Sequence, residues 1–286
     1  MSTKPVIVIT GATNGIGQLA AVDLAKHGVH LVLIARSAKK AEATRALIEQ
    51  AAPGTVCDTF FSDFSAMDDV LRVGKEIADS YDHIDVLINN AGIHTFEQRV
   101  TKDGFPETVA VNYFAPWLLT RALMGALTRS GHSRVVNVAS RASNRALLTL
   151  PVDLTDTTPF SLRGSFPIYG KSKLLNIMFN HHMAREHAHT NVTFNALCPG
   201  FNLTGLGREL PFARFLHYAI SLTGLGDPTR GAGIIVYLAI DPEVEGKTGG
   251  FYSEKHELLT PVAQATDVEL QKVLWQTTEK VLEQWL

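Results

Sequence analysis

The chain has 286 residues, a formal net charge of −2, 45% hydrophobic residues and 19% charged residues. This length and hydrophobic content suffice for one large α/β core and argue against intrinsic disorder. The near-neutral charge, without a run of lysines and arginines, argues against a nucleic-acid partner. Two cysteines, Cys57 and Cys198, are too few for a disulfide-stapled secreted fold, so we expect both thiols to be reduced.

The N-terminal residues lead directly into a strand pattern and do not have the apolar region and cleavage site of a signal peptide. No uninterrupted apolar run reaches the ~18 residues that a membrane-spanning helix needs. We therefore expect a cytoplasmic protein without a membrane span.

Short apolar runs that predict strands alternate along the chain with longer stretches whose apolar spacing predicts helices. The expected strands cover residues 6–9, 30–35, 55–61, 84–88, 134–139, 191–197 and 248–252. The expected helices cover residues 16–27, 38–50, 67–81, part of 105–130, 168–189, 229–239 and 268–286. This order predicts an α/β fold: one Rossmann-type domain over residues 1–286, a doubly wound parallel sheet of about seven strands with helices on both faces.

Two long stretches, residues 141–167 and 201–227, interrupt the alternation after strand ends, where the ligand crevice of such a sheet lies. We interpret both as substrate loops. The aromatic and aliphatic residues of 210–225 favour an amphipathic lid over an apolar substrate, with core packing and docking on a membrane surface as alternatives. We expect the helix over 268–286 to pack on the body or on a second subunit.

A glycine-rich turn follows the first strand and opens the first helix. Glycines there permit a tight turn and let the backbone approach a pyrophosphate at the helix N-terminus. The spacing is G-x-x-x-G-x-G, and the alternative is an ordinary strand–helix turn. The residues expected to contact the dinucleotide are Gly11, Thr13, Asn14, Gly15, Ile16 and Gly17.

The second strand ends in Arg36 and Ser37, where enzymes that prefer NAD carry an acidic residue for the adenosine ribose. A guanidinium suits a 2′-phosphate instead. We therefore predict NADP(H) as the cofactor, with a solvated arginine at a helix start as the alternative.

Tyr169 and Lys173 are four residues apart on an expected helix, so they share one face. A phenol is a poor acid–base catalyst at neutral pH, and a nearby ammonium lowers its pKa. Such spacing is common in helices and carries little weight alone.

A set of motifs extends over about residues 5 to 205. It comprises Thr10-Gly11…Gly15-Ile16-Gly17, Asn89-Asn90-Ala91-Gly92, Asn112, Asn137-Val138-Ala139-Ser140, Tyr169…Lys173 and Pro199-Gly200. In this order the set resembles the short-chain dehydrogenase/reductase family. The stretch after Tyr169 and its long gap from Ser140 look like the retinol-dehydrogenase-like branch, which also includes protochlorophyllide reductases.

The resemblance implies four catalytic roles. Tyr169 would donate a proton to the carbonyl oxygen as hydride arrives, or remove it in reverse. Lys173 would lower the pKa of Tyr169 and hold the nicotinamide ribose. Ser140 would hydrogen-bond the substrate oxygen, with Ser143 as its rival, and Asn112 would position a water that links Lys173 to solvent.

The resemblance also implies contacts to the cofactor beyond the glycine turn. Asp63, followed by Phe64, would accept from the adenine amino group. The remaining expected contacts are Asn90, Ala91 and Gly92 on the adenosine side, and Pro199, Gly200, Asn202 and Thr204 around the nicotinamide.

We therefore predict an NADP(H)-dependent carbonyl reductase or alcohol dehydrogenase that acts on an apolar small molecule and uses no metal. The resemblance implies a homodimer or homotetramer, with a monomer as the alternative, because the insertion before Tyr169 can accompany monomers. The alternative function is a non-catalytic NADP-binding sensor or scaffold.

Overall fold

A computed structural model describes residues 4–200 and 227–286 of the chain. Within these residues the strands form a seven-stranded parallel sheet in the order β3-β2-β1-β4-β5-β6-β7. The strands are β1 (Val6–Thr10), β2 (His30–Ala35), β3 (Cys57–Phe61), β4 (Val86–Asn89), β5 (Ser133–Val138), β6 (Val192–Leu197) and β7 (Phe251–Tyr252). The predicted doubly wound Rossmann-type sheet is confirmed, with strand boundaries that differ by a few residues.

Helices connect the strands. They are α1 (Gly15–Ala25), α2 (Ala38–Ala51), α3 (Met67–Ser80), α4 (Glu107–Val109), α5 (Ala115–Arg129), α6 (Leu162–Glu186), α8 (Pro228–Ile240), α9 (Ala263–Thr266) and α10 (Val268–Val281). A π-helical turn, η1 (Ala110–Phe114), joins α4 to α5, and short 3₁₀ turns are η2 (Arg141–Arg145), η4 (Pro242–Val244) and η5 (Glu283–Trp285).

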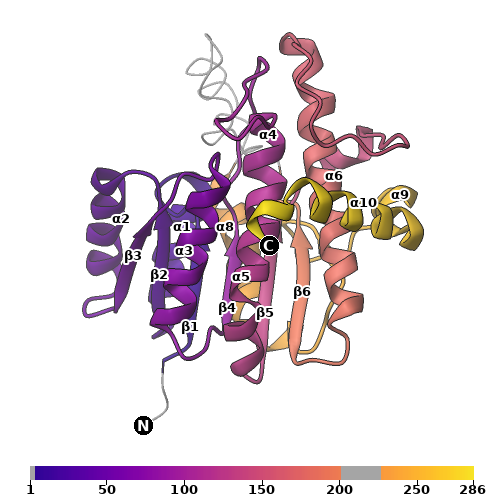
Figure 1. Ribbon diagram of the computed structural model, residues 1–286. Helices are drawn as coiled ribbons and strands as arrows, with labels where there is room; N and C mark the ends of the chain where they lie inside the picture. The colour runs from indigo at the N-terminus through magenta and orange to yellow at the C-terminus, as the bar shows by residue number, and fades with distance from the viewer. Residues whose placement is uncertain (1–3, 201–226) are drawn as a thin grey trace.

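The sheet has one helical layer on each face (Figure 1). Side chains alternate along a strand, so Ile7 and Ile9 of β1 join one core cluster with residues of α1, α2 and α8. Val6 and Val8 join the other cluster, with residues of α3, α5, α6 and α10. A parallel sheet buried on both faces explains the continuous apolar runs that predicted the strands.

Helix α6 begins at Leu162, earlier than the sequence predicted. The prediction began the helix at Ile168 and assigned 141–167 to irregular structure. In the structure η2 and the first turns of α6 occupy part of that stretch, and Pro167 lies inside the helix. The proline costs the one hydrogen bond that its missing N–H would make, and the helix continues through it.

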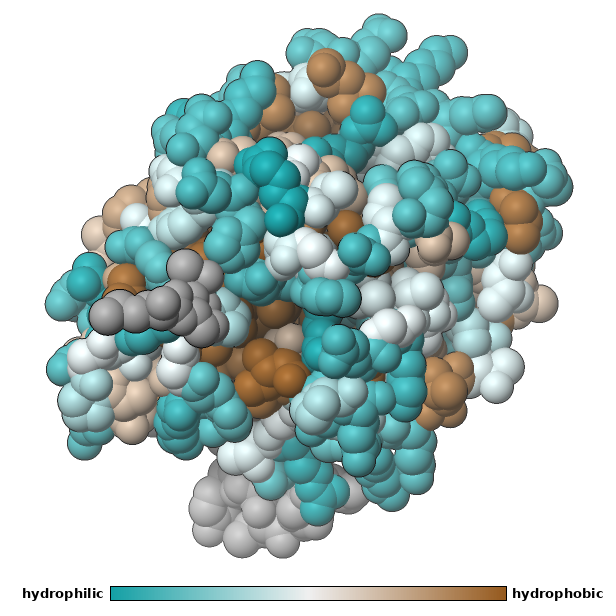
Figure 2. Space-filling view, turned by 90° about the horizontal axis from the view of Figure 1, so that it is seen from below, coloured by the Kyte–Doolittle hydropathy of each residue, from teal (hydrophilic) through white to brown (hydrophobic). Residues whose placement is uncertain are grey.

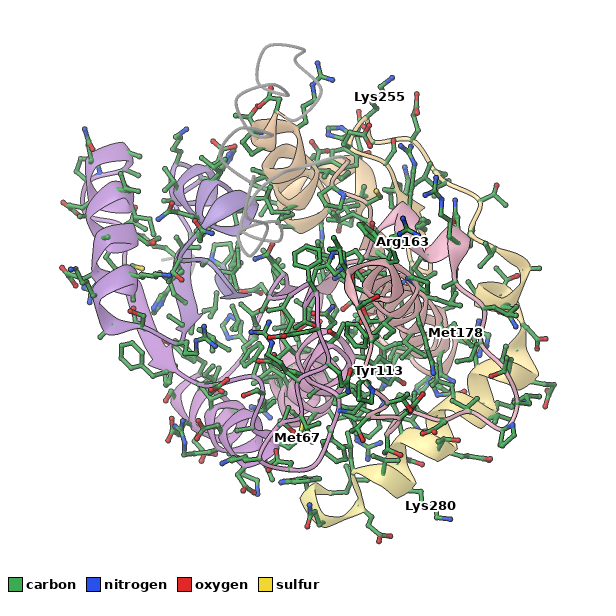
Figure 3. All side chains as sticks on the ribbon, turned by 90° about the horizontal axis from the view of Figure 1, so that it is seen from above. Met67, Tyr113, Arg163, Met178, Lys255 and Lys280 are labelled. Atoms are coloured by element: carbon green, nitrogen blue, oxygen red, sulfur yellow. The ribbon has the colours of Figure 1, made fainter. Side chains whose placement is uncertain are left out.

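The C-terminal helix α10 packs on the outer layer of the body, against α6. Figure 3 shows Tyr113 inside this layer and Lys280 of α10 pointing away from it. The Tyr113 hydroxyl hydrogen-bonds Thr278 Oγ1 at 2.8 Å, and the Trp117 and Trp275 rings lie 5.0 Å apart. This helix thus covers the side of α5 and α6 that faces away from the sheet.

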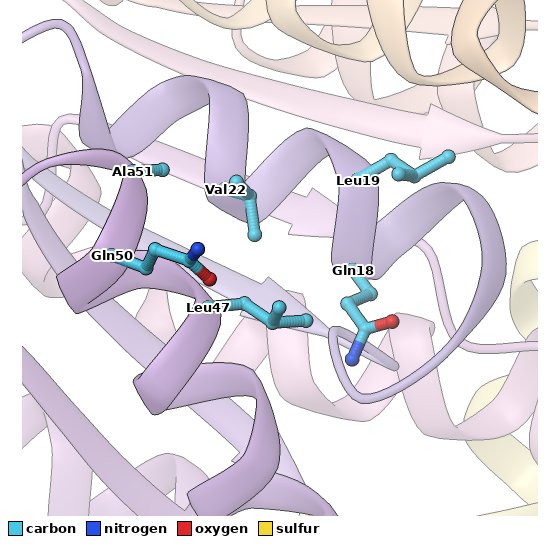
Figure 4. Close-up of a pocket in the computed structure, with 6 residues that line it drawn as sticks. All are labelled: Gln18, Leu19, Val22, Leu47, Gln50 and Ala51. Carbon is cyan, nitrogen blue, oxygen red and sulfur yellow. The ribbon is translucent and has the colours of Figure 1, made fainter.

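The surface seen from below is mostly hydrophilic, with hydrophobic residues in separate small areas (Figure 2). A groove between α1 and α2 is lined by Gln18, Leu19, Val22, Leu47, Gln50 and Ala51 (Figure 4). None of these six residues belongs to the predicted site. Among the described residues, no helix has the length and apolar character to cross a membrane.

Helix α1 approaches the end of β4 unusually closely at Gly17. A Cβ added to Gly17 would lie 2.2 Å from Asn90 Nδ2 and 2.7 Å from the Gly11 carbonyl oxygen. Gly11 itself has a φ of +67°, a conformation that favours glycine. The glycines at these two positions are therefore required by the packing of the turn itself.

We expect Gly17→Ala to lower the free energy of unfolding by about 1–3 kcal/mol, because the added methyl group overpacks the turn. The matched control is Gly233→Ala on α8, where a Cβ would meet no heavy atom within 4 Å. That change should raise stability by about 0.5–1 kcal/mol through helix propensity. Urea unfolding measures both, and equal effects at the two positions would contradict this packing.

Candidate active site

The predicted site residues gather at the carboxyl edge of the sheet. The glycine turn follows β1, Arg36 follows β2, and Asp63 lies just beyond β3. Ser140 and Pro199 follow β5 and β6 in the same way. Because the strands are parallel, these ends face one crevice, as expected for a ligand site in a doubly wound sheet.

The Thr10 hydroxyl fixes the glycine turn against the segment after β4. Thr10 Oγ1 accepts hydrogen bonds from the Asn90 and Ala91 backbone N–H groups at 3.0 and 2.9 Å. The Asn90 side chain donates back to the Thr10 carbonyl at 2.8 Å. These bonds hold the glycine turn and the Asn90–Gly92 segment rigidly together. The side-chain amide of Asn90 is therefore used to hold the glycine turn.

The N-terminus of α1 has the features of an anion cradle. Its N-cap, Asn14, is extended (φ −168°), and its side chain makes no capping hydrogen bond. Gly15 has a φ of +58°. The N–H groups of the first helical turn, which carry the positive end of the helix dipole, therefore receive no side-chain cap. A phosphate group is the ligand that such a turn suits.

The end of the crevice beside β2 and β3 is polar and open. Arg36 is exposed directly after β2, and within the described residues its guanidinium makes no hydrogen bond or ion pair. Ser37 caps α2 by accepting from Lys40 N at 3.5 Å. Asp63 Oδ1 accepts from the backbone and hydroxyl of Ser65, and the Phe64 ring packs on the core. This end of the crevice therefore carries the Arg36 guanidinium after β2 and the Asp63 carboxylate after β3.

The π-helical turn η1 directs Asn112 into the site. Its Oδ1 accepts from Ile93 N at 2.8 Å, and its Nδ2 donates to Ile93 O at 2.9 Å and to Ser172 Oγ at 3.0 Å. Asn112 is fully buried, and Ser172 in turn donates to the Tyr169 carbonyl at 2.8 Å. One amide thus links the segment after β4, the π turn and helix α6. The extra residue of a π turn changes the direction in which a side chain points, which here brings Asn112 into the site. No pattern in the sequence predicted this turn.

Tyr169 and Ser140 meet at the end of β5. Ser140 Oγ accepts a hydrogen bond from Ala142 N at 3.1 Å. Burial raises the pKa of Tyr169 above its ordinary value, and the Cys198 thiol adds to the rise, while the neighbouring Ser140 side chain lowers it. The phenol therefore stays protonated at neutral pH.

Lys173 is buried beside this pair. Its Nζ donates to the Val138 carbonyl at 2.8 Å and lies 5.7 Å from the centre of the Tyr169 ring. Burial lowers the pKa of Lys173 to about 8. A Cβ at Gly92 would lie 3.3 Å from Asn112 Oδ1 and 3.4 Å from Lys173 Nζ, so glycine leaves room for both. The structure brings Asn112, Ser140, Tyr169 and Lys173 together as predicted, although the net shift of the Tyr169 pKa is upward.

The far end of the crevice is described only up to Gly200. Gly200 has a φ of +77° and packs against the Glu254 side chain, which lies 3.7 Å from Arg141 across the end of β6. Cys198 is buried, and its Sγ accepts from Arg141 N at 3.3 Å. Asn202, Thr204 and the expected lid over 210–225 lie outside the described residues.

The sequence reasoning did not single out His94 and Ser165. The His94 ring stacks on Tyr169, and His94 Nε2 lies 3.0 Å from Ser165 Oγ. His94 comes two residues after the Asn-Asn-Ala-Gly motif at the end of β4. A titratable side chain so close to the carboxyl end of a strand is the sequence feature that could have identified His94 as a candidate site residue.

Comparison with known proteins agrees with the fold and the motifs. A family model described as short chain dehydrogenase matches residues 5–152. Retinol dehydrogenase 14 of Mus musculus is 33% identical over 96% of this chain and 84% of its own. A putative daunorubicin C-13 ketoreductase of Streptomyces sp. (strain C5) is 32% identical over 95% of this chain and 90% of its own.

Among solved structures, a putative NAD(P)-dependent gluconate 5-dehydrogenase of Beutenbergia cavernae, with bound NADP, has a similar fold. Its TM-score is 0.68 at 24% identity, over 88% of this chain and 96% of that one. The fold, the converged motifs and these relatives agree: the chain belongs to the short-chain dehydrogenase family of oxidoreductases, in its retinol-dehydrogenase-like branch.

Proposed function

We propose that this protein is an NADP(H)-dependent oxidoreductase that interconverts an alcohol and a carbonyl on an apolar small molecule. The observation that carries the proposal is that Ser140 and Tyr169 are neighbours, with the buried Lys173 ammonium beside the Tyr169 ring. Three groups that can hold an oxygen, deliver a proton and balance the resulting charge lie within one crevice.

Each side chain has a separate task in carbonyl reduction. Ser140 donates a hydrogen bond to the substrate oxygen, where negative charge develops. Tyr169 gives its proton to that oxygen as general acid, and the Lys173 ammonium stabilises the phenolate that remains. Asn112 holds the backbone around Lys173 and positions a water that links Lys173 to solvent. The Tyr169 phenolate then regains its proton from the Lys173 ammonium, which is reprotonated through that water. The bound NADPH supplies the hydride to the carbonyl carbon.

NADP fits the residues that the structure places at the other end of the crevice. The uncapped first turn of α1 suits the pyrophosphate, and the exposed Arg36 suits a 2′-phosphate. A side chain at position 11 or 17 would collide with the segment after β4, so only glycine fits at these two positions of the turn. The structural neighbour described with bound NADP supports the same choice for a shared fold.

An apolar substrate is supported by the residues beside Tyr169. The Phe96 and Phe166 rings pack around His94, which stacks on Tyr169, and Phe166 is more than half exposed. The relatives are described as a retinol dehydrogenase and a putative daunorubicin C-13 ketoreductase. We propose the same class here, carbonyls or alcohols on a large apolar body. The cytoplasmic location and the oligomeric state stay predictions from the sequence.

The direct test is NADPH oxidation by the whole protein across a panel of aldehydes, ketones and quinones. With any accepted substrate, Tyr169→Phe should lower kcat/KM by about 10²–10⁴-fold, because the proton donor is lost, while NADPH still binds. The matched control is Tyr237→Phe on α8, which should keep full activity. Full activity of Tyr169→Phe would contradict the mechanism, and NADPH binding without any turnover would favour the sensor.

The pH dependence follows from Lys173. Its folded pKa of about 8 lies below the ordinary value of 10.5, so the ammonium is present below pH 8 and is lost as pH rises through that value. Since the phenolate left by proton donation needs the ammonium, kcat/KM for carbonyl reduction should be high below about pH 8 and fall above it. Lys173→Arg keeps its charge and should move the fall to higher pH.

The control for this measurement is Lys171→Arg, since the Lys171 ammonium donates to the Asp153 carbonyl away from Tyr169. Its pH profile should match that of the unchanged protein. A Lys173→Arg profile that falls at the same pH as the unchanged protein would show that another group titrates.

Cofactor choice tests Arg36. We expect Arg36→Asp to weaken NADPH binding about tenfold or more, because a charge-assisted contact to the 2′-phosphate is replaced by repulsion. NADH binding should stay or improve. Arg45→Asp on α2, the helix that follows Arg36, makes the same charge change and should leave the preference unaltered. Fluorescence titration gives both dissociation constants, and an unchanged ratio in Arg36→Asp would refute the assignment.

A further inference from the structure

His94 lies face to face with the proposed proton donor. The centres of the His94 and Tyr169 rings are 4.6 Å apart, and their planes are inclined by 19°. This is a stacked contact in which the imidazole covers one face of the phenol ring. His94 belongs to the segment after β4, whereas Tyr169 belongs to α6, so the contact joins two separate elements of the site.

Hydrogen bonds fix the orientation of the imidazole. Ser165 Oγ donates its single proton to the Leu162 carbonyl at 2.7 Å. The same oxygen lies 3.0 Å from His94 Nε2, within hydrogen-bond distance. Ser165 is fully buried in the first turn of α6. The His94 ring is therefore tied to the start of α6 through the Ser165 hydroxyl.

Two further rings enclose His94. Phe96 lies 4.6 Å from it at 40°, and Phe166 lies 5.2 Å away edge-on at 78°. Phe166 directly follows Ser165 and precedes Pro167, which fixes the backbone there and removes one helical hydrogen bond. Packing on these two sides restricts rotation of the imidazole, so its remaining face is presented to Tyr169.

We propose that His94 is a positioning residue that holds the Tyr169 ring with its hydroxyl against Ser140. This proposal rests on the proposed function, because it assigns to His94 the alignment of Tyr169 as the proton donor. A tyrosine side chain turns about two bonds, and its hydroxyl, at the far end, moves most when the ring tilts. A flat partner on one face stops that tilt without touching the substrate. Misplacement of a reacting group by about 1 Å can cost about 10²-fold in rate.

The experiment compares His94→Ala and His94→Phe in the full chain with a substrate found by the NADPH panel. His94→Ala removes the stack and should lower kcat about tenfold, with KM and the NADPH dissociation constant within about twofold. His94→Phe keeps a flat ring without the imidazole nitrogens and should restore kcat to within about threefold of the unchanged protein. The control is His256→Ala, which removes an equivalent stack on Tyr237, 4.0 Å and 14°, outside the site.

A second readout does not need turnover. The ultraviolet titration of the Tyr169 phenol is obtained as the difference between each protein and its Tyr169→Phe variant. In His94→Ala the freed ring gains solvent, so the pKa of Tyr169, raised by burial, should fall toward its ordinary value. In His94→Phe it should stay as in the unchanged protein. Circular dichroism checks separately that each variant is folded, because an unfolded chain would also show an ordinary tyrosine.

The outcomes separate the two proposals. Unchanged kcat and an unchanged phenol titration in His94→Ala would overturn the role of His94. So would a raised KM with unchanged kcat, or His94→Phe as slow as His94→Ala, because these indicate substrate contact or imidazole chemistry. Activity of Tyr169→Phe would instead remove the proposed function, and the phenol titration would still decide whether His94 holds the ring.

Discussion

The side-chain amide of Asn112 joins the three segments on which the site depends. It closes a pair of hydrogen bonds with the Ile93 backbone and adds a third to Ser172. Each such bond contributes about 1 kcal/mol, and a buried amide left without partners costs more. The π turn that presents Asn112, the strand end that carries Gly92 and the helix that carries Lys173 therefore hold one another in place.

This packing sets the electrostatics of the site. Lys173 and Tyr169 lose most of their solvation, so the pKa of the ammonium falls and that of the phenol rises. Both shifts disfavour charge while the site is at rest. A phenol that keeps its proton until negative charge appears on a neighbouring oxygen is a suitable general acid, and a nearby ammonium then favours the phenolate. The arrangement therefore suits a phenol that donates its proton in carbonyl reduction better than a phenol that is permanently ionised.

The sequence predicted the strands and the glycine turn between β1 and α1 well because local patterns determine both. Buried parallel strands are continuous apolar runs, and the glycine turn is required by contacts within a few ångströms of Gly17. The π turn at Asn112 and the start of α6 before Pro167 were missed, since tertiary packing decides them. The stack of His94 on Tyr169 joins residues 75 positions apart, and no periodicity reports such a contact. Asn202 and Thr204 lie outside the described residues, so their placement stays a prediction.

The central claim is hydride transfer to a carbonyl carbon with the proton delivered from this protein. Its most direct measurement is a single turnover with NADPH deuterated at the transferable position and a carbonyl substrate, analysed by mass spectrometry of the product. The proposed function predicts an alcohol with one deuterium on the former carbonyl carbon, attached from one face only. NADPH that binds and remains unoxidised, or a product without deuterium at that carbon, would contradict it.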